Sequence, residues 1–126
     1  MNLYYETYGN GAPLLLLHGA LESISSYSAI IPILAKKFKV IALDTRGHGH
    51  STVDSTKLSY ELYADDVFKF LDKLGLDSVN VLGWSGHTRL IAYSIKDSKL
   101  VIFKKASHDA PVEIPEKFAA TVLDFF

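Results

Sequence analysis

Short runs of apolar residues alternate along the chain with longer stretches whose apolar residues recur at helical spacing. The short runs predict strands over residues 4–8, 13–17, 40–43, 79–82 and 100–103. The intervening stretches predict helices over residues 25–38, 59–75 and 88–96, with a last helix from residue 115 onward. Pro32 in the first of these stretches implies a kink or a late start of that helix. The second and third strands are apolar throughout, which is typical of strands buried on both faces of a sheet.

Several residues mark the expected ends of these elements. Ser59 is suited to cap the start of the 59–75 helix, and Gly75 is suited to end it. Pro115 fits the first turn of the last helix. Residues 9–11 (GNG) predict a tight hairpin between the first two strands, because glycine and asparagine adopt positive φ readily. The residues of the last helix expected to face inward are Phe118, Val122, Phe125 and Phe126.

Strands that alternate with helices in this way form mostly parallel sheets with helices on both faces. The sequence therefore predicts an α/β fold, a three-layer sandwich with about six strands in its sheet. The 126 residues leave room for one domain, and an apolar content of 48% suffices for a core that needs neither a metal ion nor a disulfide.

Composition narrows the class of function. The chain has no cysteine, which excludes disulfides, thiolate metal sites and a thiol nucleophile. Its 13 lysines and arginines nearly balance its 14 aspartates and glutamates, so we expect it to bind neither nucleic acid nor an anionic membrane. No apolar run approaches the roughly 20 residues of a membrane-spanning helix, and the first residues show no signal-peptide pattern. We therefore expect a cytoplasmic protein.

Candidate chemistry gathers where the expected strands end. In parallel sheets of α/β proteins, ligands bind at the carboxyl ends of the strands. His18 directly follows the second strand, Asp44 directly follows the third, and Ser85 comes shortly after the fourth. His108 and Asp109 lie a few residues beyond the fifth strand. These side chains are the first candidates for a functional site.

Four segments of the chain resemble motifs of the α/β-hydrolase superfamily, and they occur in that family's order. Residues 14–19 (LLLLHG) are similar to its strand and oxyanion loop, and residues 44–51 (DTRGHGHS) to its D-x-R-G-x-G-x-S segment. Residues 82–85 (LGWS) look like its nucleophile elbow, a strand-to-helix turn that exposes a serine hydroxyl. Residues 107–118 are similar to the loop that bears its catalytic histidine and to the helix after that loop.

The resemblance implies a set of catalytic roles. It implies Ser85 as the nucleophile and His108 as the general base, with the backbone N–H groups of Ala20 and Gly86 as the oxyanion hole. Acyl transfer needs these parts, because a base removes the hydroxyl proton and the donors stabilise the oxygen that becomes negative. The side chains expected to contact the substrate are Leu21 and Trp84.

The acid of a Ser-His-acid triad stays open. Asp97 alone preserves the family's chain order of serine, acid and histidine, but a full helix length separates it from His108 in the expected topology. Asp109 and Asp44 lie at the correct edge of the sheet, and Glu113 resembles a family carboxylate that supports the loop. We favour Asp109 slightly and keep a Ser-His dyad as the alternative. Loss of the orienting acid lowers kcat of a triad protease by about 10⁴-fold.

Other polar residues of the motifs have structural interpretations. We expect His18 to pack and hydrogen-bond within its own loop. We expect Asp44, Arg46 and Ser51 to fix the loop after the third strand rather than to act chemically.

The chain also departs from the family pattern. His87 stands where the family usually has glycine, because the elbow leaves little room for a Cβ atom. The usual lid and acid-bearing loop between elbow and histidine are missing, so we expect residues 1–126 to form one shortened, lidless hydrolase domain. His48, His50 and His87 are possible metal ligands, but no carboxylate or fourth ligand follows them at helical spacing. We therefore expect no metal or other cofactor.

These features predict a serine esterase that acts on small, accessible carboxylic esters through an acyl-enzyme on Ser85. The alternative is a catalytically weak or silent domain kept as a scaffold or binding module, which the altered elbow and the missing acid favour. A third hypothesis is a related reaction at the same site, such as perhydrolysis or carbon–carbon bond hydrolysis. Because a shortened sheet exposes an edge and apolar surface, we also expect a homodimer.

Overall fold

Four strands form the sheet in the part of the chain that the computed structural model describes, residues 1–54, 57–83 and 110–126. They are β1 (Tyr5–Tyr8), β2 (Ala12–Leu17), β3 (Phe38–Leu43) and β4 (Asn80–Gly83), in the spatial order β1-β3-β2-β4. β2 is parallel to both β3 and β4, whereas β1 is antiparallel to β3. The α/β class is confirmed. The four described strands are fewer than the number expected, and the predicted elements at 88–96 and 100–103 lie outside the described residues.

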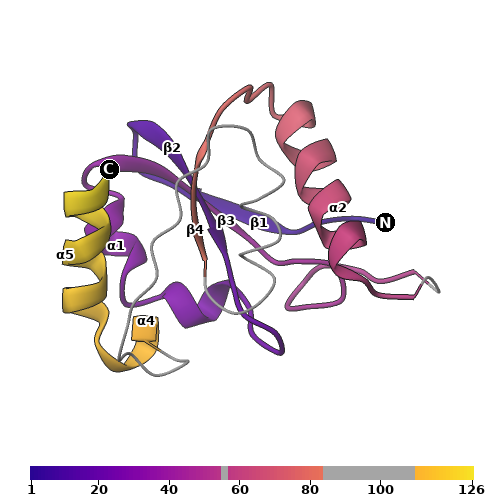
Figure 1. Cartoon of the computed structure of the whole chain (residues 1–126), viewed down its shortest axis with the longest axis horizontal. Coiled ribbons are helices and arrows are strands. Elements are labelled where there is room, and N and C mark those ends of the chain that lie inside the picture. The colour runs from indigo at the N-terminus through magenta and orange to yellow at the C-terminus, as the bar shows by residue number, and fades with distance from the viewer. Residues whose placement is uncertain (55–56, 84–109) are drawn as a thin grey trace.

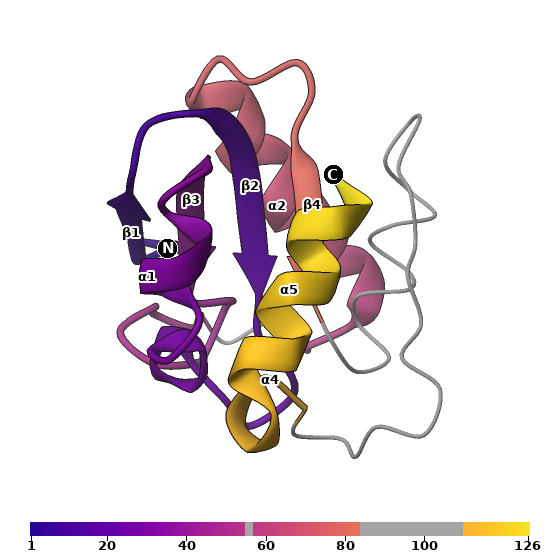
Figure 2. The same cartoon turned by 90° about the vertical axis from the view of Figure 1, so that its left-hand side faces the viewer.

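Helices cover both faces of the sheet (Figures 1 and 2). On one face, Leu14 and Leu16 of β2 pack in a cluster with residues of η1 (Ile24–Tyr27), α1 (Ile31–Leu34) and α5 (Pro115–Phe125). On the other face, Leu15 and Leu17 pack with residues of α2 (Tyr60–Lys73). Successive side chains of a strand point to opposite faces, so an uninterrupted apolar β2 supplies both clusters. The predicted three-layer arrangement is confirmed.

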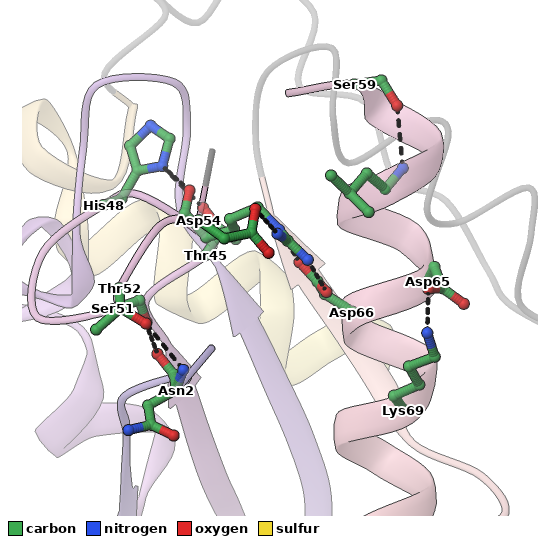
Figure 3. Close-up of polar contacts among 12 residues, drawn as sticks. Asn2, Thr45, His48, Ser51, Thr52, Asp54, Ser59, Asp65, Asp66 and Lys69 are labelled. Atoms are coloured by element: carbon green, nitrogen blue, oxygen red, sulfur yellow. Dashed lines mark hydrogen bonds and ion pairs between the residues drawn. The ribbon is translucent and has the colours of Figure 1, made fainter. Parts of the chain in front are cut away.

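The ends of α2 follow from its sequence. The Ser59 side chain accepts a hydrogen bond from the backbone N–H of Leu62 at 3.2 Å, which satisfies one of the unpaired donors of the first turn (Figure 3). Gly75 follows the helix with a φ of 67°, a left-handed conformation that glycine adopts without steric penalty. Both predicted ends of this helix are confirmed.

The last helix, α5, is also confirmed, with Pro115 in its first turn and Phe118 and Val122 buried. Phe126 packs edge-on against Phe38 at 6.0 Å between ring centroids, which joins the end of the chain to β3. A further short helix that the sequence did not predict, α4 (Ala110–Glu113), precedes it.

The helix predicted over residues 25–38 is shorter than the predicted range, and the late start that Pro32 implies is confirmed. The structure has two short pieces there, η1 and α1, separated by a turn. Pro32 lies in the first turn of α1, where a residue without an N–H group is tolerated. The apolar positions still serve the core, because Tyr27, Ile30 and Leu34 are buried.

The predicted hairpin between the first two strands is also wrong. β1 pairs with β3 rather than with β2, so the turn at residues 9–11 crosses the start of β3. A Cβ atom on Gly9 would lie 2.4 Å from the backbone oxygen of Ala35, and one on Gly11 would lie 2.2 Å from that of Lys37. The glycines therefore permit close approach of two backbones, which is a different use from the one expected.

β1 is an edge strand, and within the described residues no strand pairs with its outer side. The homodimer expected to cover an exposed edge stays a prediction. Among the helices in the described part of the chain, none combines the length and apolar content that crossing a membrane requires.

Candidate active site

The carboxyl ends of three parallel strands lie level at one edge of the sheet. Leu17, the last residue of β2, pairs with Leu43 of β3 on one side and with Gly83 of β4 on the other. The connection after β2 passes to the face of α1, and the connection after β3 passes to the opposite face, where α2 lies (Figure 2). Such a divergence marks the place where α/β proteins bind ligands. The candidate site is therefore formed by residues 18–23, called the β2 loop, and residues 44–54, called the β3 loop.

His18 opens the β2 loop and is buried, with 3% of its surface exposed. Its Nε2 accepts a hydrogen bond from the backbone N–H of Thr45 at 3.0 Å, which assigns the ring proton to Nδ1. That Nδ1–H donates to the carbonyl oxygen of Gly19 at 2.8 Å. Burial lowers the pKa of His18, so the imidazole is neutral near pH 7. The expectation that His18 hydrogen-bonds within its loop is confirmed.

Beyond Gly19 the β2 loop turns outward. Ala20 is exposed, and Leu21 has 94% of its surface exposed. Leu21 has a φ of 65°, a left-handed conformation that disfavours residues with a Cβ atom by about 1–2 kcal/mol. The backbone N–H of Ala20 donates no hydrogen bond to any residue that the structure describes. A donor of this kind at a strand end is suited to bind an oxygen atom of a ligand.

Asp44 is buried, with 1% of its surface exposed, and it holds three segments together. Its Oδ1 accepts a hydrogen bond from the Ile24 N–H at 2.8 Å, and its Oδ2 accepts one from the His50 N–H at 2.9 Å. The Ser51 hydroxyl donates to the Asp44 carbonyl oxygen at 2.6 Å and accepts from the Tyr4 N–H at 2.8 Å. The interpretation of Asp44 and Ser51 as residues that fix a loop is confirmed.

Arg46 fastens the β3 loop to α2. Its Nε and Nη2 donate to the two carboxylate oxygens of Asp66, each at 2.7 Å, and its Nη1 donates to Asp54 at 2.9 Å. Figure 3 shows that Asp54 lies on the β3 loop and Asp66 on α2. The hydrogen bond with Asp66 is the main cause that raises the pKa of Arg46, so the guanidinium stays charged. Arg46 and Asp66 are only 6% and 7% exposed, which makes this a buried ion pair.

Two further histidines lie in the β3 loop. The ring of His48 is 5.1 Å from the ring of His18, and its Nδ1 is 2.9 Å from the carbonyl oxygen of Arg46. His50 is exposed, and its Nδ1 lies 3.5 Å from Oδ2 of Asp44. Within residues 1–54, 57–83 and 110–126, no three histidine, aspartate or glutamate side chains come together as ligands for a metal ion.

Comparison with known proteins assigns this arrangement to a family. A family model described as alpha/beta hydrolase fold matches residues 12–93, well over half of the 126 residues. The chain belongs to the alpha/beta hydrolase family.

Three similar proteins illustrate the family. A soluble epoxide hydrolase from Corynebacterium sp. is 40% identical over 98 residues, which is 75% of this chain and 34% of that protein. An sn-1-specific diacylglycerol lipase from Xenopus tropicalis is 35% identical over 107 residues, 80% of this chain and 33% of that protein. The crystal structure of an enol-lactonase from Burkholderia xenovorans is 30% identical with a TM-score of 0.65, covering 73% of this chain and 36% of that one. The chain thus spans about a third of the length of these alpha/beta hydrolases.

The structure describes part of the site predicted for this alpha/beta hydrolase. Ala20 and Leu21 form the exposed tip of the β2 loop, at the carboxyl edge of the sheet. Glu113 lies in α4 and is exposed. The remaining predicted residues lie outside the described part of the chain, and they are Trp84, Ser85, Gly86, His87, Asp97, His108 and Asp109.

Two contributors to the site were not predicted from the sequence. Thr45 acts through its backbone N–H, which no side-chain pattern reveals. Asp66 does carry a signal, because it lies three residues after Tyr63 and directly before Val67 on the apolar stripe of α2. A carboxylate in such a stripe predicts a buried partner of opposite charge, and Arg46 is that partner.

Proposed function

We propose that this alpha/beta hydrolase hydrolyses small carboxylic esters through an acyl-enzyme. In this mechanism Ser85 Oγ attacks the ester carbonyl carbon, His108 transfers the hydroxyl proton to the leaving alcohol, and water then hydrolyses the acyl-serine. The observation that most directly supports the proposal is the Ala20 N–H, which has no partner among the described residues and lies at the carboxyl edge of the sheet. The neighbouring strand β4 ends there at Gly83, two residues before Ser85 in the sequence.

A serine nucleophile favours esters over epoxides as substrates. A serine oxygen that opened an epoxide would be left as an ether, which has no carbonyl carbon for water to attack. Attack on an ester leaves an acyl-serine, whose carbonyl carbon water does attack. The similar proteins include both an epoxide hydrolase and a lipase, and the chemistry of residue 85 favours the reaction of the second.

The exposure of the β2 loop supports small and accessible substrates. Ala20 is exposed and Leu21 has 94% of its surface exposed, so the proposed oxyanion donor lies beside an apolar side chain that is open to solvent. Such a surface gives an acyl chain little to bury against, and binding of long chains gains free energy only from buried apolar area. We therefore propose short-chain esters as the substrate class.

Hydrolysis of p-nitrophenyl acetate by wild type, Ser85→Ala and His108→Ala proteins tests the proposal. Both variants are expected to lose nearly all of the catalysed rate, because nucleophile and base act as one unit. Ser78→Ala, which alters an exposed serine just before β4, is the matched control and should keep the wild-type rate. A fluorophosphonate should label wild type and Ser78→Ala but not Ser85→Ala. Equal rates in wild type and both active-site variants would support the catalytically silent domain instead.

We further propose Asp109 as the acid that orients His108. Asp109→Asn is expected to lower kcat by up to about 10⁴-fold, because the wrong imidazole tautomer would then face the nucleophile. An unchanged kcat in Asp109→Asn would leave the Ser-His dyad as the reacting unit.

A further inference from the structure

The peptide between Gly19 and Ala20 is held by hydrogen bonds on one side only. Its carbonyl oxygen accepts from Nδ1 of His18 at 2.8 Å and from the N–H of Glu22 at 3.3 Å. The peptide is trans, so its N–H group, which belongs to Ala20, points away from that carbonyl. Fixing the oxygen therefore also fixes the direction of the Ala20 N–H.

The imidazole that holds this peptide is itself fixed. The Thr45 N–H donates to Nε2 of His18 at 3.0 Å, and a backbone N–H cannot accept in return. The proton of the neutral ring is thereby kept on Nδ1, on the side of Gly19. Because His18 is 3% exposed, packing leaves the ring little freedom to rotate.

The far end of the β2 loop is tied to the same support. Asp44 Oδ1 accepts from the Ile24 N–H at 2.8 Å, and Asp44 directly precedes Thr45 in the β3 loop. Between the two ties, Leu21 keeps a left-handed conformation, and such backbone strain persists only where surrounding contacts hold it.

We propose that His18 is a positioning residue for catalysis. The Thr45 N–H fixes the imidazole of His18, the imidazole fixes the Gly19–Ala20 peptide, and the Ala20 N–H is thereby directed at the substrate oxyanion. This inference rests on the proposed ester hydrolysis. His18 transfers no proton in this role. It acts by orienting the Ala20 N–H before the reaction. A donor that is already oriented stabilises the negative charge of the transition state without a cost of reorganisation.

Two substitutions of His18 separate positioning from a general loss of structure. His18→Asn places an amide nitrogen where Nδ1 was and can still donate to Gly19, whereas His18→Leu cannot. Both variants remove the acceptor of the Thr45 N–H equally. We expect His18→Leu to lower kcat for p-nitrophenyl acetate by about 10–100-fold with KM nearly unchanged, below the full loss seen when an oxyanion donor is deleted. His18→Asn should recover part of that loss, because its amide still donates to Gly19 but is no longer fixed by the Thr45 N–H.

Tyr27→Phe is the matched control, because it removes a buried hydroxyl that donates to the carbonyl oxygen of Leu17 at 2.8 Å, next to His18, and leaves the hydrogen bonds of His18 in place. It should keep kcat within about threefold of wild type. The inference is overturned if His18→Leu also stays within threefold, or if His18→Asn falls as far as His18→Leu. Circular dichroism and urea unfolding of each variant identify any loss that comes from misfolding.

A measurement without substrate separates this inference from the proposed function. The ¹H–¹⁵N NMR signal of Ala20 should shift strongly in His18→Leu and return toward its wild-type position in His18→Asn, since it reports the orientation of the peptide. If Ser85→Ala keeps the wild-type rate, the proposed function is wrong and the catalytic part of this inference falls with it. If Ser85→Ala is inactive but the Ala20 signal and kcat are the same in His18→Leu as in wild type, the positioning role alone is wrong.

Discussion

The β2 loop and the β3 loop leave neighbouring strands at the same edge of the sheet, yet they differ in burial and in hydrogen bonding. The β3 loop buries the polar side chains of Asp44, Arg46 and Ser51, and each of them has hydrogen-bond partners. The β2 loop exposes Ala20 and Leu21, and it keeps a backbone donor without a partner among the described residues. The β3 loop is thus held by its own hydrogen bonds, whereas the β2 loop leaves a donor available for the substrate that we propose.

The difference shows how an exposed loop acquires a fixed shape. Buried polar groups are tolerated only when they are paired, so the conformation of the β3 loop is set by many contacts at once. The β2 loop has few such contacts of its own, but its two ends are tied to the β3 loop through Thr45 and Asp44. We infer that the β3 loop supplies the rigidity that the β2 loop needs to present Ala20.

The largest expected effect comes from separating the β3 loop from α2. In Asp66→Asn, the Arg46 guanidinium loses a carboxylate that it contacts through two hydrogen bonds of 2.7 Å. Removing one partner of a buried ion pair typically lowers the free energy of unfolding by about 3–5 kcal/mol, and we expect about 3 because Asp54 still faces the guanidinium. Urea unfolding measures the change.

The neighbouring residue of the same helix provides the control. Asp65 pairs with Lys69 at 2.6 Å, but both side chains are largely exposed, so Asp65→Asn should lower the free energy of unfolding by at most about 0.5 kcal/mol. Similar losses in Asp65→Asn and Asp66→Asn would mean that burial does not strengthen the Arg46 ion pair.

A smaller effect is expected from two glycines of the β3 loop. Gly47 and Gly49 both have positive φ, but a Cβ atom on Gly49 would lie 2.1 Å from Oδ2 of Asp44, whereas one on Gly47 would meet Val53 at an ordinary 3.5 Å. We expect Gly47→Ala to lower the free energy of unfolding by about 1 kcal/mol through backbone strain, and Gly49→Ala by about 2 kcal/mol because overpacking is added. Thermal unfolding of the pair measures the difference, and equal losses would show that the Asp44 carboxylate is free to move.

Local sequence signals predicted the elements whose ends depend on local contacts. Ser59 and Gly75 bracket α2 because capping and the left-handed stop involve only neighbouring residues. The predicted hairpin at residues 9–11 is wrong because a hairpin and a close backbone crossing both require glycine. The oxygens of Ala35 and Lys37 that decide between them are distant in the sequence.

The candidate site divides in the same way. The rule that ligands gather at strand ends located His18 and Asp44, and the family resemblance pointed to Ala20. The sequence could not reveal that the Thr45 N–H sets the tautomer of His18, since this contact runs through the backbone between two loops. Nor did it show that Leu21 adopts a positive φ, because that conformation is disfavoured for a residue with a Cβ atom and the residue type does not predict it.

The hydrogen bond from the Thr45 N–H to His18, which joins the two loops, is expected to weaken in acid. Burial, followed by the charge of His48, lowers the pKa of His18, while the Gly19 carbonyl, Asp44 and Glu22 oppose this shift. The unfolded chain therefore binds a proton at His18 near pH 6.5, before the folded protein does. The free energy of unfolding should be fully retained above pH 6.5 and should fall as the pH drops below it, until the folded protein also takes up the proton. Urea unfolding from pH 8 to pH 5 measures the free energy of unfolding of wild type and of His18→Asn. The variant has no imidazole at residue 18, so its free energy of unfolding should fall less with decreasing pH than that of wild type. An equal decrease in both proteins would contradict the prediction.

The smallest effect tests the strain in the exposed loop. Leu21 has a φ of 65° and 94% of its surface exposed, so Leu21→Gly relieves the left-handed conformation and gives up almost no buried area. The strain energy removed from the folded protein slightly exceeds the entropic stabilisation that glycine gives to the unfolded chain. We therefore expect the free energy of unfolding to rise by up to about 1 kcal/mol. Ala20→Gly, in the same loop but without positive φ, should instead lower it by about 0.5–1 kcal/mol. A loss of stability in both variants, measured by urea unfolding, would show that Leu21 is not strained and that the contrast between the two loops lies in burial alone.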